Sequence, residues 1–131
     1  MQFEKISKPD LQTYRLFKSN KNREFFTFLN KSAIKQLSRI INTSVFFYKV
    51  YDNQKFIGCL FVNSIDEKNK IIEFGGFADR HTNTVQAVKE LSAFLKYHFP
   101  NYKIKALTKY LTAKLCLIKA GFKNNKGDYE L

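Results

Sequence analysis

Residues 71–107 read IIEFGGFADRHTNTVQAVKELSAFLKYHFPNYKIKAL, and this stretch decides the fold. The apolar run from Ile71 to Phe77 has the length and bulk of a β-strand. Apolar residues then recur at helical spacing and predict a helix that ends before Pro100: Val85, Val88, Leu91 and Leu95. The alternation over 102–107 predicts another strand. A strand, a helix and a strand in this order form a crossover that joins two parallel strands of one sheet.

An antiparallel meander precedes this crossover. Residues 44–51 and 56–63 are rich in β-branched and aromatic side chains, which predicts two strands joined by a turn at 52–55. The polar stretch 64–70 predicts the next turn, so the strand at 71–77 is the third of the meander.

Helices and short strands are predicted at the two ends of the chain. Residues 2–7 alternate like a strand, and a short helix follows the turn at Lys8-Pro9-Asp10. A second helix is predicted over 22–41 from its apolar positions: Phe25, Phe28, Leu29, Ile34, Leu37 and Ile41. A last helix ends at Gly121, and its predicted apolar positions are Leu111, Leu115, Ile118 and Phe122. Residues 128–131 predict a final strand.

The resulting order is β-α-α-β-β-β-α-β-α-β, which predicts an α+β fold in α/β/α layers. Its central sheet is expected to be mixed and mostly antiparallel, with about six strands. The 131 residues contain no repeat, linker or low-complexity stretch, so we expect a single domain over residues 1–131.

The composition excludes several classes of protein. The chain carries a net charge of +12, and 44% of its residues are hydrophobic, so it is not a disordered chain. No apolar run is long enough to span a bilayer and no signal peptide is visible, so we expect a cytoplasmic protein without a membrane partner, either a monomer or a homodimer. The two cysteines and two histidines are scattered without ligand spacing, which predicts free thiols and no metal site.

The basic charge is concentrated at the ends of the chain. Residues 1–43 have a net charge of +6, residues 44–100 of +1, and residues 101–131 of +5. A basic domain of this size suggests nucleic-acid binding. The aromatic residues, however, fall on periodic apolar positions typical of a core, and no nucleic-acid-binding motif is present.

Three features of the sequence resemble the GNAT superfamily of acyl-CoA-dependent N-acetyltransferases across nearly the whole chain. The last helix is similar to the family pattern N-x-x-A-x-x-L-Y-x-K-x-G-F, with matches at Ala113, Lys119, Gly121 and Phe122. The hairpin at 51–58 is similar to the start of the family's third strand. The strand–loop–helix unit at 71–95 stands in the place of the cofactor-binding motif.

The resemblance implies acetyl-CoA as co-substrate, with its pyrophosphate at the N-terminus of the helix that follows the loop. The family pattern Q/R-x-x-G-x-G/A fits from Arg80 or, as we prefer, from Thr82, although neither register supplies the first Gly. The residues expected to bind the cofactor are Phe77, Arg80, Thr82, Asn83, Thr84, Val85, Gln86 and Ala87. The alternative is a plain connection with Asn83 or Thr84 as N-cap. In the family the pantetheine arm lies between two splayed strands, and a bulge at Gly75-Gly76 would suit that splay.

Two residues are expected to carry the chemistry. Glu73 lies in mid-strand, where relatives often carry a basic carboxylate, and would act as general base; the alternative is a solvated or Lys-paired carboxylate. The family's general-acid Tyr is replaced by Leu117, so Tyr110 and Cys116 are the nearest substitutes as donors to the CoA thiolate.

The leading hypothesis is therefore an N-acetyltransferase that acts on a primary amine of a small molecule, peptide or protein. Nucleic acid would enter only through the acceptor. Because the loop Gly and the acid Tyr are absent, a GNAT-like binding module without catalysis is the alternative, and a basic nucleic-acid-binding domain is the third.

Overall fold

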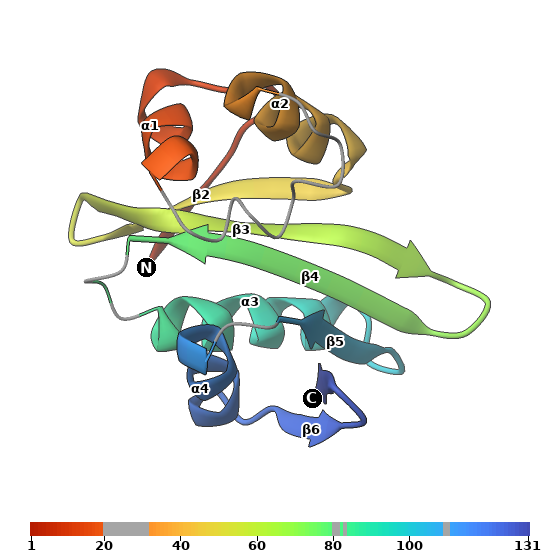
Figure 1. Cartoon of the computed structure of the whole chain (residues 1–131). Coiled ribbons are helices and arrows are strands. Elements are labelled where there is room, and N and C mark those ends of the chain that lie inside the picture. The colour runs from red at the N-terminus through yellow and green to blue at the C-terminus, as the bar shows by residue number, and fades with distance from the viewer. Residues whose placement is uncertain (20–31, 80–81, 83, 109–110) are drawn as a thin grey trace.

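The computed structural model describes residues 1–19, 32–79, 82, 84–108 and 111–131 (Figure 1). Its elements in chain order are β1 (Gln2–Lys5), α1 (Leu11–Ser19), α2 (Ala33–Thr43), β2 (Phe46–Asp52), β3 (Lys55–Asp66), β4 (Ile71–Ala78), α3 (Val85–His98), β5 (Lys103–Leu107), α4 (Leu111–Lys119), β6 (Lys123–Asn125) and β7 (Asp128–Glu130).

The strands form one sheet in the order β1-β2-β3-β4-β5-β7-β6. The pairs β1–β2, β2–β3 and β3–β4 are antiparallel, β4–β5 is parallel, and β5–β7 and β7–β6 are antiparallel. Helices α1 and α2 lie on one face of the sheet and α3 and α4 on the other (Figure 1). The α/β/α layers and the crossover predicted from residues 71–107 are confirmed.

The two faces of the sheet bury separate cores. Under α1 and α2, the rings of Phe47 and Phe61 stack at 5.3 Å, and Phe17 packs edge-on against Phe77 at 5.3 Å. Under α3 and α4, the core is mainly aliphatic, with Ile72, Leu95 and Ile104 fully buried. Phe47 lies within one of these cores and Phe46 packs against the other, as expected for aromatic residues at periodic apolar positions.

The sheet has seven strands, one more than the roughly six predicted. The additional strand is β6, whose three polar residues are all exposed and therefore carry no alternating pattern. It forms a hairpin with β7 through Lys126 and Gly127, both with positive φ. Strand β3 is also longer than predicted and runs to Asp66.

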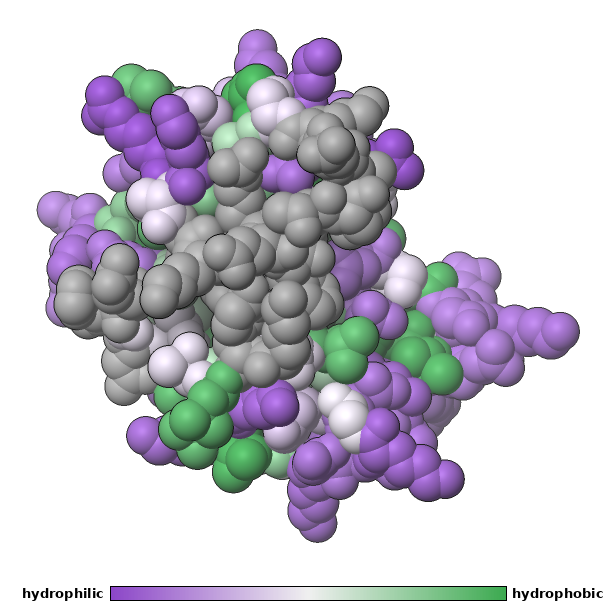
Figure 2. All heavy atoms as spheres, in the orientation of Figure 1, coloured by the Kyte–Doolittle hydropathy of each residue, from purple (hydrophilic) through white to green (hydrophobic). Residues whose placement is uncertain are grey.

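Two helices differ from their predicted apolar faces. Helix α2 begins at Ala33, and the predicted positions Phe25, Phe28 and Leu29 lie outside the described residues; Ile34 is 43% exposed. In α4, exposed side chains include three of the four predicted core positions: Leu111, Leu115 and Ile118. Leu117, Ala120 and Phe122 are buried and anchor this segment instead. Figure 2 shows hydrophobic atoms at the surface where α4 lies.

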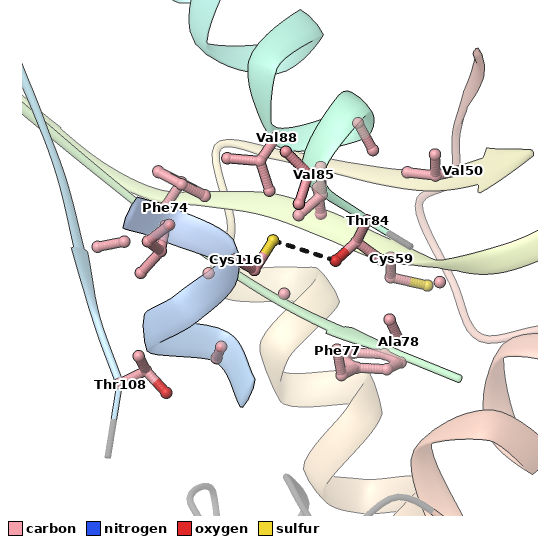
Figure 3. A pocket seen from close by; sticks show the side chains of 18 of the residues that line it. Val50, Cys59, Phe74, Phe77, Ala78, Thr84, Val85, Val88, Thr108 and Cys116 are labelled. Atoms are coloured by element: carbon pink, nitrogen blue, oxygen red, sulfur yellow. Dashed lines mark hydrogen bonds between the residues drawn. The ribbon is translucent and has the colours of Figure 1, made fainter. Parts of the chain in front are cut away.

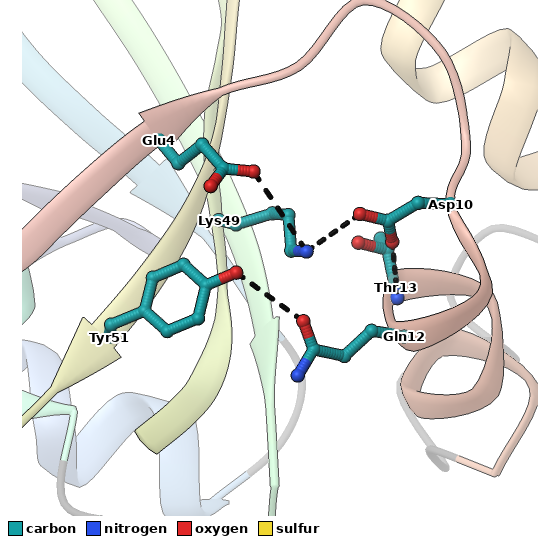
Figure 4. Close-up of polar contacts among 6 residues, drawn as sticks. All are labelled: Glu4, Asp10, Gln12, Thr13, Lys49 and Tyr51. Carbon is teal, nitrogen blue, oxygen red and sulfur yellow. Dashed lines mark hydrogen bonds and ion pairs between the residues drawn. The ribbon is translucent and has the colours of Figure 1, made fainter. Parts of the chain in front are cut away.

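An ion pair between a buried lysine and a partly exposed aspartate fastens α1 to the sheet. Asp10 caps α1 by accepting a hydrogen bond from the Thr13 N–H at 2.8 Å, and it accepts another from the Lys49 ammonium at 2.6 Å (Figure 4). The Lys49 side chain is only 5% exposed, whereas that of Asp10 is 40% exposed. The carboxylate of Glu4 lies 4.0 Å from the same ammonium.

The pair moves both pKa values away from neutrality. Burial by itself lowers the pKa of Lys49, but the contacts with Asp10 and Tyr51 together outweigh it, so the pKa is raised. Burial likewise raises the pKa of Asp10, but Lys49 and the Thr13 N–H outweigh it, so the pKa is lowered. The stabilisation is therefore present above the unfolded Asp pKa of about 3.9 and below the unfolded Lys pKa of about 10.4. It is lost as the pH falls through the folded Asp10 pKa or rises through the folded Lys49 pKa.

Removing either partner of this ion pair is expected to have unequal effects. Asp10→Ser keeps a capping hydroxyl but leaves the Lys49 ammonium buried, so the free energy of unfolding at pH 7 falls by about 3 kcal/mol. Lys49→Met removes the buried charge and leaves a hydrated carboxylate, at a cost of about 1 kcal/mol. Urea denaturation at pH 7 and pH 3 measures both variants. The cost of Asp10→Ser shrinks at pH 3; equal costs for the two variants at pH 7 would contradict this asymmetry.

Candidate functional site

The pairing of β4 with β5 stops halfway along β4. Their parallel pairing runs from Ile71↔Lys103 to Phe74↔Ala106 and then ends. Strand β4 continues along β3 alone, with Gly75 opposite Phe61 and Phe77 opposite Cys59. Among the described strands, none therefore lies beside the edge of β4 at Gly75–Phe77 that faces β5.

A cleft of about 490 Å³ lies in this opening. Its walls come from the middle of β3, from β4 beyond Ile72, from the start of α3, from the end of β5 and from one face of α4. Figure 3 shows Phe74 and Phe77 of β4, Thr84 and Val85 at the start of α3, and Cys116 of α4 around the same space. The splay that the resemblance implied is thus present as a cleft between β4 and β5.

The N-terminus of α3 opens into the cleft. Thr84 occupies the N-cap position, as the alternative interpretation allowed, but its side chain makes no capping hydrogen bond. Its Oγ1 instead lies 3.3 Å from the Cys116 Sγ, and this contact joins α3 to α4 (Figure 3). The first helical hydrogen bond runs from the Val88 N–H to the Thr84 carbonyl. Main-chain N–H groups in the first turn of a helix attract anions.

Most of the predicted cofactor-binding residues that are described line the cleft, namely Phe77, Thr82, Thr84, Val85 and Ala87. Gln86 is exposed and is not part of the wall. The Thr82 hydroxyl donates to the Asp79 carbonyl at 2.6 Å and so fixes the end of the loop. Arg80, Asn83 and Tyr110 lie outside the described residues.

The bulge expected at Gly75-Gly76 is in the opposite strand. Gly75 and Gly76 pair regularly with Phe61 and Leu60, whereas the register of β3 shifts between Val62 and Ser64. The two glycines instead allow β4 to pack closely against β3. A Cβ on Gly76 would lie 2.7 Å from the Cys59 carbonyl oxygen, and one on Gly75 would lie 3.1 Å from the Phe61 ring.

Glu73 lines the cleft at the end away from the N-terminus of α3, and its side chain is half-buried. Its neighbours Ile72 and Phe74 enter the core under α3 and α4, so by strand alternation Glu73 faces the side of α1 and α2. Within the described residues, no ion pair or hydrogen bond engages its carboxylate, so the Lys-paired alternative is not observed there.

Several cleft residues were not predicted as site residues. They come from β3, the end of β5 and α4: Asn63, Leu107, Thr108, Thr112, Leu115 and Lys119. The matches at Ala113 and Lys119 in the last helix were the signal that could have placed α4 at the site. Asn63 had no such signal, because a bulge is not visible in the residue pattern.

Within the described part of the chain, no three His, Cys, Asp or Glu side chains are grouped so that they could hold a metal ion. None of the helices described is both long and apolar enough to cross a lipid bilayer. Both described cysteines are free thiols.

Solved structures of acetyltransferases have the same fold. A spermidine N-acetyltransferase from Vibrio cholerae superposes with a TM-score of 0.69 at 12% identity, over 99% of this chain and 92% of that chain. An aminoglycoside acetyltransferase in complex with coenzyme A gives 0.68 at 16% identity, over 97% and 90%. A microcin self-immunity acetyltransferase in complex with acetyl-CoA and AMP gives 0.60 at 13% identity, over 98% and 91%.

No protein-family model matches the sequence, and no curated protein is significantly similar to it. The structural likeness nevertheless covers almost the whole chain in each comparison. The chain therefore has the GNAT fold, as the sequence predicted.

The glycines of the cleft wall yield a testable difference. Gly76→Ala is expected to lower the free energy of unfolding by about 2 kcal/mol, because the new methyl group meets the main chain of β3, which cannot move aside. Gly75→Ala is expected to cost less than half of that, since the Phe61 ring can shift by a few tenths of an ångström. Thermal unfolding of the two variants measures the difference, and a Gly76→Ala variant as stable as the parent would contradict it.

Proposed function

We propose that this chain is an acyl-CoA-dependent N-acetyltransferase that moves an acetyl group from acetyl-CoA to a primary amine. The observation that carries the proposal is the edge of β4 at Gly75–Phe77, open along a cleft that ends at the N-terminus of α3. Two proteins of the same fold are described in complex with coenzyme A or acetyl-CoA.

Successive parts of acetyl-CoA fit successive parts of the cleft. The main chain of β4 at Gly75–Phe77 would pair with the amides of the extended pantetheine arm, as a sheet edge pairs with a peptide. The pyrophosphate would lie at the first turn of α3, where N–H groups and the helix dipole favour negative charge. Lys119 is exposed on the cleft wall and would add a positive charge near the phosphates. The apolar wall residues Val85, Ala87 and Leu117 would exclude water from the pantetheine arm between them.

Bound acetyl-CoA supplies a thioester carbonyl for attack and a thiol leaving group. Glu73 would take one proton from the acceptor ammonium, so that the neutral nitrogen forms a C–N bond as the C–S bond breaks. The nitrogen gives up a second proton as the amide forms, and the departing thiolate gains one. Main-chain N–H groups at the open edge of β4 are suited to stabilise the negative charge on the carbonyl oxygen.

Two residues are candidates for protonating the thiolate. Tyr110 is the candidate predicted from the sequence, and it lies outside the described residues. Cys116 lies in the cleft with its Sγ 3.3 Å from the Thr84 Oγ1. Leu117, at the position of the family's Tyr, is buried and has no proton to donate. That last observation favours a second candidate function, a module of GNAT fold that binds acetyl-CoA without turnover.

Binding and turnover separate these two functions. Millimolar acetyl-CoA is expected to raise the melting temperature of the parent chain, because it binds only the folded state. Glu73→Gln is expected to leave that shift unchanged and to lower the acetylation rate about 100-fold, since the amide cannot accept the proton. Glu67→Gln, in an exposed turn, is the matched control. Absence of any shift would overturn the proposed function; a shift without turnover would support the binding module.

The charge on α4 gives a second test. Lys119→Ala is expected to weaken acetyl-CoA binding severalfold at low salt, and the difference shrinks as salt screens the phosphate contact. Lys123→Ala, in the exposed strand β6 and outside the cleft wall, controls for net charge. Isothermal titration at two salt concentrations measures both variants, and equal affinities would remove Lys119 from the phosphate site.

A further inference from the structure

Asn63 is the extra residue of the bulge in β3. The register of the β3–β4 pair passes from Val62↔Phe74 directly to Ser64↔Glu73, so Asn63 has no partner of its own in the ladder. In such a bulge, two residues of one strand stand opposite one residue of the other, and the bulge re-aims side chains next to it. The residue that Asn63 and Ser64 face together is Glu73.

Asn63 and Glu73 point to the same face of the sheet. Gly75 shares the face of Glu73 because the two residues are separated by one position in β4. The Asn63 Nδ2 lies 3.6 Å from the position that a Cβ on Gly75 would take, so the amide is above that face as well. Both side chains line the cleft, at the end away from the N-terminus of α3.

Neither polar group is used within the described fold. No hydrogen bond or ion pair among the described residues engages the side chain of Asn63 or Glu73. The nearest cation by register is Lys105, opposite Glu73 in β5, but its ammonium is held by Glu130 at 3.2 Å and Asp128 at 3.6 Å. An exposed amide and a half-buried carboxylate thus remain open to a ligand that carries N–H donors.

We propose that Asn63 binds the acceptor amine of the transferase reaction, with its Oδ1 accepting one N–H while Glu73 takes the proton from another. This assignment rests on the proposed function and adds its acceptor subsite. A primary ammonium has three N–H donors, so it can engage both groups, and after loss of one proton the amine still donates to Asn63. A tertiary ammonium has one N–H and cannot engage both. The pair therefore fits acceptors whose ammonium carries at least two N–H donors, a condition that primary amines meet with one donor to spare.

The test measures acceptor and acetyl-CoA parameters separately. Thiol release from acetyl-CoA is followed with three primary amines of different charge: benzylamine, lysine and aminoethyl phosphate. The best of them is then used with the variants Asn63→Ala and Asn63→Asp. Asn101→Ala, exposed in the turn after α3, is the matched control. Acetyl-CoA affinity and melting temperature are recorded for every variant.

Asn63→Ala is expected to raise the acceptor KM about tenfold, because one hydrogen bond to the acceptor is lost. The kcat should change less, and the affinity for acetyl-CoA should stay the same. Asn63→Asp keeps an accepting oxygen and is expected to restore the KM to within about threefold of the parent value. An unchanged acceptor KM in Asn63→Ala would overturn the subsite and leave the proposed function standing. Binding of acetyl-CoA without acetylation of any of the three amines also overturns it, whereas a parent chain that does not bind acetyl-CoA overturns the proposed function itself.

Discussion

The parallel pairing of β4 with β5 ends at Phe74 and Ala106, and the rest of the site depends on that separation. A sheet whose strands stay paired has no room between them, because neighbouring strands lie only about 4.8 Å apart. Once the strands separate, the main chain of β4 loses its partner on one side while β3 continues to hold it on the other. The result is an edge of β4 without a partner strand among the described residues, beside a cleft of about 490 Å³.

Because different helices cover the two faces of the sheet, the two ends of the cleft favour ligands of different charge. On the side of α3 and α4, a helix N-terminus without a side-chain cap and an exposed lysine favour an anionic ligand. On the side of α1 and α2, a carboxylate and an amide without partners in the described fold favour a ligand with N–H donors. A reaction between a phosphorylated thioester and an amine needs both characters in one cleft. The net charge of +12 contributes only a general attraction for anions.

The sequence predicted the layers and the crossover, because these follow from apolar periodicity and from the order of the elements. The place of the cleft was implied by the resemblance to the GNAT superfamily. Prediction from the sequence failed where tertiary packing overrides periodicity. Leu111, Leu115 and Ile118 of α4 have helical spacing but remain exposed, since Leu117, Ala120 and Phe122 anchor the segment to the core instead. The bulge was placed at Gly75-Gly76 from glycine content, whereas the register puts it at Asn63, a residue with no local mark of a bulge. Strand β6 was missed because all three of its residues are polar and exposed.

The central claim is that the unpaired edge of β4 and the start of α3 hold acetyl-CoA, and hydrogen exchange at main-chain amides tests it most directly. Saturating acetyl-CoA should slow exchange in peptides that cover Gly75–Phe77 and the first turn of α3, because their N–H groups gain acceptors. Peptides from β1 and β6, at the two outer edges of the sheet, should be unchanged. Exchange at Gly75–Phe77 that stays the same with and without saturating acetyl-CoA would contradict the account.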